Sequence, residues 1–315
     1  EGSFTMSELM KAKGNLLQET VGVREKTNPG KIALADADTI VYAVCSVCEY
    51  GDDEAGYQID MDYALETAHE KIRGILEATG CDSIELHFTM GKNFRFTITD
   101  TYKANRAGTR TPVGLSELKK LLTPLYPNSV IHTDIEADDY VVWKKSQEPD
   151  LYVLTAVDKD VLHSVAGKHY NYYQNGKYQI SPKWVIITEG TPLPWFYLQV
   201  LMGDTGDGIE GLPKCGPNAA FLILAPELKA RFSDLKAQYK AEKGKSPTDL
   251  LKQVIMPNNL LDEVEQSNSV LYERVVAAYK AKGLAEKDVI MSARLVSMHQ
   301  LNENGELDLW TSPTN

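Results

Sequence analysis

The apolar residues of the chain follow two patterns, which predict strands and helices that alternate. Short apolar runs that end in polar residues are typical of buried strands; they cover Ile32 to Ala35, Ile84 to Thr89 and Leu151 to Val157. Longer stretches repeat apolar residues at the spacing of one helix face; they cover Tyr63 to Ala78, Val113 to Leu122 and Ala137 to Lys145. This alternation predicts an α/β fold with a mostly parallel sheet flanked by helices. Tyr172 to Ile180 predicts a hairpin turned at Asn175-Gly176, a dipeptide that readily takes positive φ angles.

The pattern differs at the start of the chain and after about Pro194. Residues 7–29 predict a leading amphipathic helix and a loop, and the first five residues read as an expression scar before Met6. Beyond Pro194 the strand pattern stops, and helices follow, with a glycine- and proline-rich stretch at 203–217. We therefore expect a leading segment at 1–30, an α/β domain at 31–200 and a helical region at 201–315.

Composition indicates a folded protein without a membrane segment. Hydrophobic residues make up 43% of the 315 residues and charged residues 24%, as in globular domains. No apolar run approaches the roughly 18 residues that a membrane span needs, and no secretory segment opens the chain. The four cysteines include one close pair, Cys45 and Cys48, too few for a disulfide framework or a closed zinc site. We expect reduced thiols on the inner face of a helix, and a cytoplasmic protein.

The charge is distributed unevenly. The formal net charge is −11, which taken alone argues against a nucleic-acid partner. The segment 91–120, however, holds seven basic residues and only two acidic ones. The basic residues are Lys92, Arg95, Lys103, Arg106, Arg110, Lys119 and Lys120. This local positive charge favours contact with phosphates.

Four acidic clusters suggest metal binding. They are Asp36-Ala37-Asp38, Glu136-Ala137-Asp138-Asp139, Asp158-Lys159-Asp160, and Asp204 with Asp207 between Gly203 and Gly208. The first and third follow predicted strands, and ligands of open α/β sheets bind beyond the carboxyl ends of the strands. Neighbouring carboxylates repel one another unless a cation neutralises them, and Mg²⁺ prefers oxygen ligands. Two such ions about 4 Å apart can activate a water and stabilise the leaving oxygen in phosphodiester hydrolysis.

Each acidic cluster also has a simpler interpretation as a solvated cap or turn, although four together favour metal binding. A second alternative comes from Asp36-x-Asp38 and the later Gly-Asp-x-x-Asp, which also resemble the haloacid-dehalogenase phosphatases. There one aspartate is a nucleophile and the other a general acid–base. That alternative leaves Glu136 to Asp139 and the basic segment unexplained, so it ranks second.

Two further motifs are suited to DNA. In Gly211 to Ala220, glycines flank a turn and a helix starts near Pro217. Glycine lets the backbone approach a phosphate, and a helix start offers unpaired N–H groups, although an ordinary packing element would look the same. In Tyr102-Lys103-Ala104-Asn105-Arg106, an aromatic beside two cations suits a terminal base and a phosphate. A solvated helix start is the alternative there.

In this order, the motifs resemble the flap endonuclease/5′–3′ exonuclease family. The ordered set is Asp-x-Asp at 36–38, Tyr-Lys-x-Asn-Arg at 102–106, Glu-Ala-Asp-Asp at 136–139, Asp-Lys-Asp at 158–160, Gly-Asp-x-x-Asp at 203–207 and Gly-x-Pro-x-x-Gly-Pro at 211–217. The chain is most similar to the 5′ exonucleases of short-tailed phages, which Ala293-Arg294-Leu295 and Leu309-Trp310 also resemble. The resemblance spans roughly Ile32 to Trp310; its motifs are specific as a set and weak singly.

The resemblance implies a PIN-like nuclease domain at 31–200, a helix–two-turn–helix DNA-binding motif in 201–315, and roles for residues. A first divalent ion would use Asp36, Glu136, Asp138 and Asp139, and a second Asp158, Asp160, Asp204 and Asp207. Lys103 and Arg106 would steady the scissile phosphate, with Asp158 between the ions, and Tyr102 would stack on a terminal base. The duplex would contact Gly211, Lys214, Gly216 and Asn218, where relatives bind K⁺ through loop carbonyls.

The chain departs from the family pattern in two places. Relatives carry an aspartate at the end of the second strand, where Met90 stands here, and a thioether is a poor ligand for a hard cation. Only 29 residues, Ala107 to Ile135, separate Arg106 from Glu136. They allow one helix and a loop, not the long helical arch of flap-threading relatives.

The sequence as a whole predicts a 5′–3′ exonuclease that acts on duplex or branched DNA with a 5′ end, and on RNA–DNA hybrids. We expect two Mg²⁺ or Mn²⁺ ions, K⁺ at the Gly211 to Ala220 loop, a monomer, no membrane partner and, if the protein is phage-encoded, the cytoplasm of a bacterial host. Met90 motivates the alternative of a non-catalytic DNA-binding relative.

Overall fold

The computed structural model describes residues 27–313, which fall into two compact units. The first unit holds the described residues up to 93, together with 108–162 and 168–186. The second holds 94–107, 163–167 and the described residues from 187 onward. The predicted leading helix and the expression scar lie outside the described residues, except for the turn at 27–30. Residues 94–107 belong to the second unit although the residues on both sides of them belong to the first. The pattern of apolar residues did not indicate this crossing of the chain.

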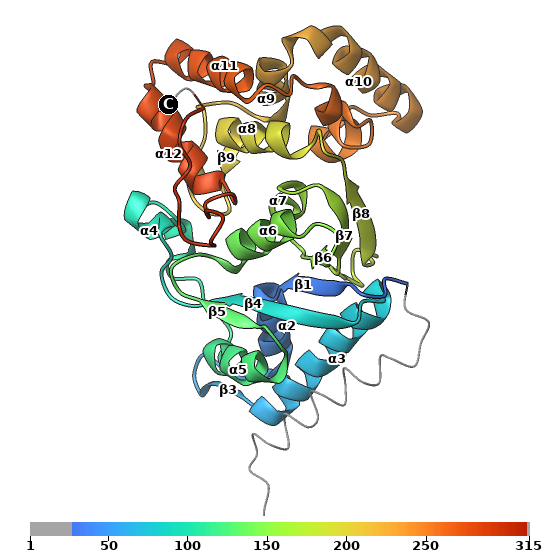
Figure 1. The fold of residues 1–315 in the computed structure, drawn as a ribbon, viewed down its shortest axis with the longest axis vertical. Helices are drawn as coiled ribbons and strands as arrows, with labels where there is room; N and C mark the ends of the chain where they lie inside the picture. The colour runs from blue at the N-terminus through green and yellow to red at the C-terminus, as the bar shows by residue number, and fades with distance from the viewer. Residues whose placement is uncertain (1–26, 314–315) are drawn as a thin grey trace, which may run out of the picture. The chain divides into compact units, whose positions relative to one another are not determined.

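The first unit is built on a six-stranded sheet within the described residues, in the order β5-β4-β1-β6-β7-β8 (Figure 1). The strands are β1 Ile32–Asp36, β4 Ser83–Thr89, β5 Val130–His132, β6 Tyr152–Thr155, β7 Gly167–Asn171 and β8 Lys183–Ile187. β4 and β6 both pair parallel with β1, β5 with β4, and β7 with β6. The mostly parallel sheet is therefore confirmed, and the three predicted strands are its inner strands β1, β4 and β6.

Helices cover both faces of this sheet (Figure 1). They are α2 Asp38–Cys48, α3 Met61–Thr79, α5 Leu115–Leu122, α6 Ala137–Gln147 and the short α7 Lys159–His163. α2, α3 and α5 share one apolar core with alternate residues of β4, namely Ile84, Leu86 and Phe88. α6 packs against β1, β4 and β6. The predicted helices are confirmed as α3, α5 and α6.

Local chemistry explains several element ends in this unit. The Asp60 carboxylate caps α3 by accepting a hydrogen bond from the Tyr63 N–H at 3.1 Å. The same helix ends at Gly80, whose φ of 64° suits glycine.

Cys45 and Cys48 are buried thiols on the inner face of α2, as predicted.

Two hairpins differ from the sequence expectation. β2 Glu49–Asp52 and β3 Gly56–Ile59 form an antiparallel pair that the apolar pattern did not indicate, because both strands are largely exposed. The predicted turn at Asn175-Gly176 is wrong. Asn175 instead bridges Ile180 through two backbone hydrogen bonds of 2.9 Å, so residues 176–179 form the loop.

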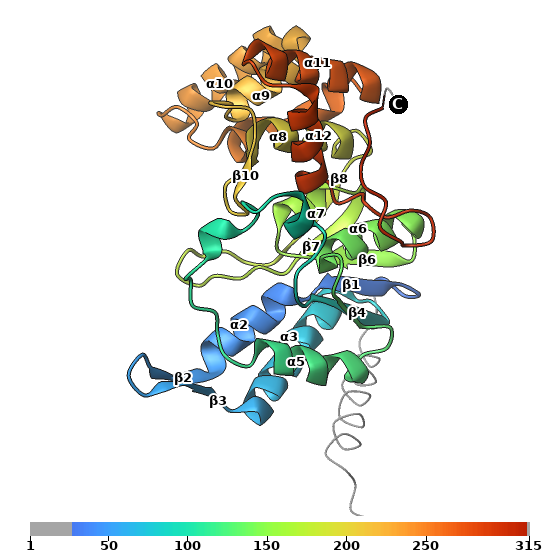
Figure 2. The ribbon, with the colours of Figure 1, turned by 90° about the vertical axis from the view of Figure 1, so that its left-hand side faces the viewer.

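The second unit is mainly helical, as predicted for the region after 200 (Figure 2). Its helices are α4 Arg95–Ile98, η2 Ala104–Arg106, α8 Pro192–Met202, α9 Pro217–Leu224, η4 Pro226–Leu228, α10 Lys229–Lys243, η5 Leu251–Ile255, η6 Leu260–Glu263, α11 Asn268–Ala281 and α12 Glu286–Val296. They enclose a core in which Trp195, Tyr197 and Tyr272 are almost fully buried. Among the described residues, no helix combines the length and apolar character needed to cross a membrane.

A short ribbon, β9 Gly203–Asp204 with β10 Ile209–Glu210, joins α8 to the loop before α9. A Cβ on Gly211 would collide with the backbone of Leu201 to Gly203, and a Cβ on Gly203 would collide with Gly211. These two glycines therefore permit backbone to pack on backbone inside the second unit. Gly211, predicted as a phosphate contact, has this internal reason to be glycine.

Candidate metal centre and nucleic-acid interface

The carboxyl edge of the sheet in the first unit brings together acids from three elements. Asp36 is the last residue of β1, and Asp158 comes three residues after the end of β6. The pairings Asp36 with His87 and Ala35 with Thr155 align the ends of β4, β1 and β6. Strand order and register therefore place Asp36 and Asp158 on one edge, as the sequence predicted.

The start of α6 adds three carboxylates to this edge. The Ala137 N–H donates to the Thr89 hydroxyl at 2.9 Å, which fixes the first turn of α6 against the end of β4. Ligand oxygens of Glu136, Asp138 and Asp139 all lie within 4.8 Å of one another. In a capping box, the Asp139 carboxylate accepts from the Glu136 N–H at 3.1 Å. Glu136 and Asp139 are buried, whereas Asp138 is half-buried.

Asp36 shows how crowded this edge is. Burial, followed by the negative charge of Asp38, raises the pKa of the Asp36 carboxyl to about 8, and Asp158 and Glu136 add to the rise. A divalent cation among these oxygens would stabilise the ionised carboxylates. The donor set consists of carboxylate oxygens, which fits a hard cation such as Mg²⁺ or Mn²⁺.

Asp158 and Asp160 frame the start of α7. The Asp160 N–H donates to the Asp158 carboxylate at 2.8 Å, and the Leu162 N–H donates to the Asp158 carbonyl at 3.2 Å. The Lys159 ammonium contacts both oxygens of the Asp160 carboxylate, at 2.8 and 2.9 Å. The local turn therefore holds Asp158 at the end of β6, while Asp160 has a cation beside it.

Asp38 has a structural role that the sequence did not reveal. Both of its carboxylate oxygens accept from the Thr89 N–H at 3.1 Å, and one lies 2.7 Å from the Lys119 ammonium. Lys119 also donates to the Thr89 carbonyl at 2.6 Å. Asp38 and Lys119 thus clamp the last residue of β4, directly before Met90. Met90 itself is half-buried, and its N–H donates to the His132 carbonyl at 2.8 Å.

Much of the basic segment 91–120 is engaged within the protein. Arg95 is buried and donates to the carbonyls of Leu295 and Ser297, both at 2.8 Å, at the end of α12. Arg110 pairs with Glu49, and Lys119 pairs with Asp38. These ion pairs and hydrogen bonds reduce the positive charge that the segment offers to DNA.

Lys103 and Arg106 lie against the 204–208 loop in the second unit. The Arg106 guanidinium hydrogen-bonds one Asp207 carboxylate oxygen, and the Lys103 ammonium lies 3.6 Å from the other. The Lys103 N–H donates to the Asp207 carbonyl at 2.7 Å, and the Asn105 amide donates to the Thr205 carbonyl at 2.8 Å. Asp207, predicted as a metal ligand, therefore also holds two of the predicted phosphate-binding cations.

Tyr102 does not present a stacking surface in this structure. Its side chain is 2% exposed and its ring packs edge-on against Phe96 with centroids 5.1 Å apart. Its hydroxyl donates to the Asp207 carboxylate at 3.2 Å. The predicted role of stacking on a base conflicts with this burial, and the motif alone gave no signal that the ring would face a core. Tyr102 instead helps to fix Asp207.

The predicted DNA-contact motif forms an exposed turn before α9. Lys214 takes a positive φ of 59°, and it is exposed together with Gly216 and Asn218. Gly216 is the N-cap residue of α9, and Asn218 lies in the first turn of that helix. The β9-β10 ribbon and this turn separate α8 from α9, and the helix–two-turn–helix motif that the resemblance implies stays a prediction.

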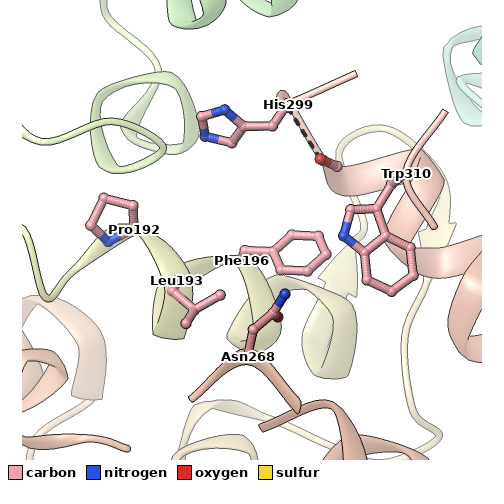
Figure 3. A pocket seen from close by; sticks show the side chains of 7 residues that line it. Pro192, Leu193, Phe196, Asn268, His299 and Trp310 are labelled. Atoms are coloured by element: carbon pink, nitrogen blue, oxygen red, sulfur yellow. Dashed lines mark hydrogen bonds between the residues drawn. The ribbon is translucent and has the colours of Figure 1, made fainter. Parts of the chain in front are cut away.

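A pocket of about 230 Å³ in the second unit has different chemistry (Figure 3). It is lined by Pro192, Leu193, Phe196, Asn268, Ser297, His299 and Trp310. The Phe196 and Trp310 rings have centroids 5.6 Å apart, and the His299 N–H donates to the Ser297 hydroxyl at 3.1 Å. None of these described lining residues is a carboxylate, so the pocket is not the predicted metal centre.

Comparisons with known proteins support the resemblance seen in the motifs. No protein-family model matches the chain. The chain is 30% identical to the 5′-3′ exonuclease of Buchnera aphidicola over 155 residues, or 47% of this chain. That match covers 52% of the relative, about half its length. The chain is also 22% identical to the exodeoxyribonuclease of Enterobacteria phage T3 over 320 aligned positions, which cover 94% of this chain and 97% of that one.

The fold is similar to that of a solved nuclease. The flap endonuclease of bacteriophage T5, in a complex with DNA and metal ions, superposes with a TM-score of 0.52 at 13% identity. The superposition covers 85% of this chain and 89% of the T5 protein. The predicted fold class, a mostly parallel sheet flanked by helices and followed by a helical region, is therefore confirmed.

Proposed function

We propose that the protein is a divalent-metal-dependent 5′–3′ exonuclease. Both the motifs and the comparisons support its resemblance to the flap endonuclease/5′–3′ exonuclease family. It would hydrolyse phosphodiester bonds of duplex or branched DNA that presents a 5′ end. The observation that carries this proposal is the gathering of Asp36, Asp158 and the acids at the start of α6 on one edge of the sheet. Such an acidic edge fits hard cations better than it fits any neutral ligand.

Within the first unit, Asp36, Glu136, Asp138 and Asp139 would hold one divalent ion. Asp158 and Asp160 would be ligands of a second ion. Thr89 and the capping box keep the first turn of α6 in place. Glu136 and Asp138 are therefore held beside the end of β4. Divalent ions at such a centre supply an activated water and neutralise the charge on the leaving oxygen. The ligand role that the resemblance implies for Asp204 and Asp207 remains part of the proposal.

In the second unit, Lys103 and Arg106 would contact the scissile phosphate. The Asp207 carboxylate pairs with both cations, and the Gly206 carbonyl accepts a further hydrogen bond from Arg106 at 3.2 Å. Prepositioned cations stabilise negative charge that develops in a transition state, because no reorganisation is needed when the charge appears. Lys214, Gly216 and Asn218 would grip backbone phosphates of the duplex without reading its sequence.

Finer points of the proposal come from the resemblance. Mg²⁺ or Mn²⁺ would be the ions, and K⁺ would bind carbonyls of the Gly211 to Ala220 loop. RNA–DNA hybrids would be further substrates, and the protein would act as a monomer. Cleavage of a hybrid, activity with and without K⁺, and a sedimentation measurement test these points separately.

The phosphatase alternative is weakened by the contacts of Asp38. That alternative needs Asp38 as a general acid–base, yet its oxygens are held by the Thr89 N–H and the Lys119 ammonium. The non-catalytic alternative rests on Met90, which stands where relatives carry an aspartate. Mg²⁺ needs few protein carboxylates when substrate phosphate and water complete its shell, so we expect activity to survive.

One experiment separates these functions. Duplex DNA labelled at its 5′ end is incubated with the protein and Mg²⁺, with EDTA as the control, beside a small phosphate ester. We expect 5′ products that form only with Mg²⁺, and no turnover of the ester. Full activity in EDTA contradicts metal dependence, binding without cleavage supports the non-catalytic relative, and ester hydrolysis alone supports the phosphatase.

A further inference from the structure

Helix α10 carries a row of four lysines on one side. Lys229, Lys236, Lys240 and Lys243 are spaced by seven, four and three residues. At 3.6 residues per turn, these spacings bring all four to one side of the helix. Lys229, Lys240 and Lys243 are exposed, and Lys236 is half-buried. We call these four residues the lysine stripe.

The other charged side chains of α10 point elsewhere. By the same helical spacing, Asp234 and Glu242 lie away from the stripe. Arg231 is also outside it and pairs with Glu263 at 2.8 Å. The stripe is therefore a one-sided positive surface in a protein whose formal net charge is −11.

Contacts within the second unit attach the stripe to the start of α9. The Lys236 ammonium donates to the Asn218 amide oxygen at 2.9 Å. The same ammonium lies 4.6 Å from the centre of the Phe232 ring, which packs against Phe221 of α9 with centroids 4.7 Å apart. Figures 1 and 2 both show α10 beside α9. The middle of the stripe, at Lys236, thus lies next to the start of α9, directly after the exposed turn that holds Lys214 and Gly216.

We propose that the lysine stripe is a second phosphate-binding track, which continues the duplex-binding surface from α9 along α10. This inference rests on the proposed function, because it takes duplex DNA as the occupant. Charge complementarity supports duplex DNA as the occupant, because lysines on a helix face without acids, three of the four exposed, match a regularly spaced row of phosphates. Lysines along a helix contact the backbone of any sequence, which suits a nuclease that degrades DNA without sequence preference.

The length of the stripe sets how much DNA it can follow. Lys229 and Lys243 are fourteen positions apart, so their Cα atoms are separated by about 21 Å along the helix axis. One strand of B-DNA advances about 3.4 Å per base pair. The whole stripe therefore matches roughly six base pairs of duplex, about three on each side of the contact between Lys236 and Asn218.

The test is a binding titration of the full chain with labelled duplex DNA in EDTA, where cleavage does not interfere. The variant is Lys240→Ala with Lys243→Ala, which leaves the packed Lys236 in place. The matched control, Lys280→Ala with Lys287→Ala, removes two exposed lysines of α11 and α12 in the same unit. A second variant, Lys240→Arg with Lys243→Arg, keeps the charges.

We expect the stripe variant to bind duplex more weakly and to lower the slope of log affinity against log salt by about 2, one for each lost phosphate contact. The control pair and the arginine variant should bind like the unaltered protein, and single-turnover cleavage at saturating DNA should be unchanged. An unchanged salt slope, or an equal loss in the control pair, overturns the proposal. Cleavage by the unaltered protein is scored separately, so a protein that binds through the stripe and never cuts refutes the proposed function alone.

Discussion

The molecule contains two acidic regions that look alike in sequence and differ in their surroundings. At the carboxyl ends of the strands in the first unit, burial and then the charges of neighbouring carboxylates raise the pKa of Asp36 to about 8. In the 204–208 loop of the second unit, Asp207 instead contacts Lys103, Arg106 and the Tyr102 hydroxyl. Acids packed against acids favour a cation from solution, whereas acids packed against cations organise those cations. Under the proposed function, the first region would hold metal, and in the second region Asp207 would also position Lys103 and Arg106 for a phosphate.

The largest expected effect concerns Asp158. Asp158→Asn removes the charge of a proposed metal ligand just after β6 while keeping the side-chain size, so turnover should fall by several orders of magnitude. The measurement is the single-turnover cleavage rate of 5′-labelled duplex. Asp234→Asn, an exposed position on α10, is the matched control and should behave like the unaltered protein. An Asp158→Asn protein with normal turnover would refute the metal centre.

Loss of the second region's positive charge should cost less. Lys103→Ala should lower the single-turnover rate by about 10²- to 10³-fold, because a charge aimed at the developing transition state is lost. Duplex affinity should change little. Because Lys103 and Asp207 contact each other, the double variant with Asp207→Asn should lose less than the two single losses combined. A rate loss explained by weaker DNA binding would contradict the catalytic role of Lys103. Strictly additive losses in the double variant would contradict its coupling to Asp207.

A smaller effect is expected at Met90. Met90→Asp adds an anionic oxygen after the β4 end that Asp38 and Lys119 hold. It should therefore lower the Mg²⁺ concentration needed for half-maximal cleavage. Cleavage rates against Mg²⁺ concentration for both proteins provide the measurement. An unchanged or higher requirement would mean that Met90 does not occupy the ligand position of the family.

The smallest effect is expected at Lys214, which belongs to neither acidic region and has a proposed role in duplex binding alone. Lys214→Ala should weaken duplex binding and reduce its salt slope by about 1, as the loss of one phosphate contact does. Turnover at saturating DNA should stay the same. A Lys214→Ala protein that binds normally but cuts slowly would reverse the roles given to Lys214 and Lys103.

The sequence was sufficient for the inner strands and for the acids at their ends. β1 and β6 are mostly apolar and buried, and β4 alternates Ile84, Leu86 and Phe88 with polar residues, which is also a strand pattern. The carboxyl ends of such strands are where ligands bind. β5 has three residues and β8 is partly exposed, so neither gives a clear apolar pattern. The outer strands therefore could not be predicted.

The sequence could not separate charges that serve the protein from charges that serve a ligand. Arg95, Lys119 and Asp38 were indistinguishable from the other charged residues of their segments. Arg95 contacts Leu295, and Lys119 contacts Thr89 and Asp38. These are tertiary contacts between segments that lie far apart in the sequence. The contact between Tyr102 and Asp207 likewise spans 105 positions, so the burial of Tyr102 left no local pattern.

Direct metal binding tests the central contrast most sharply. Free Mn²⁺ would be measured by electron paramagnetic resonance during titration of the unaltered protein, Asp36→Asn and Lys103→Ala, with thermal unfolding as a check on the fold. We predict that Asp36→Asn loses the tightest Mn²⁺ binding and that Lys103→Ala keeps it, although both cut DNA slowly. Unaltered Mn²⁺ binding by a folded Asp36→Asn protein would contradict the assignment of the metal to the edge of the sheet.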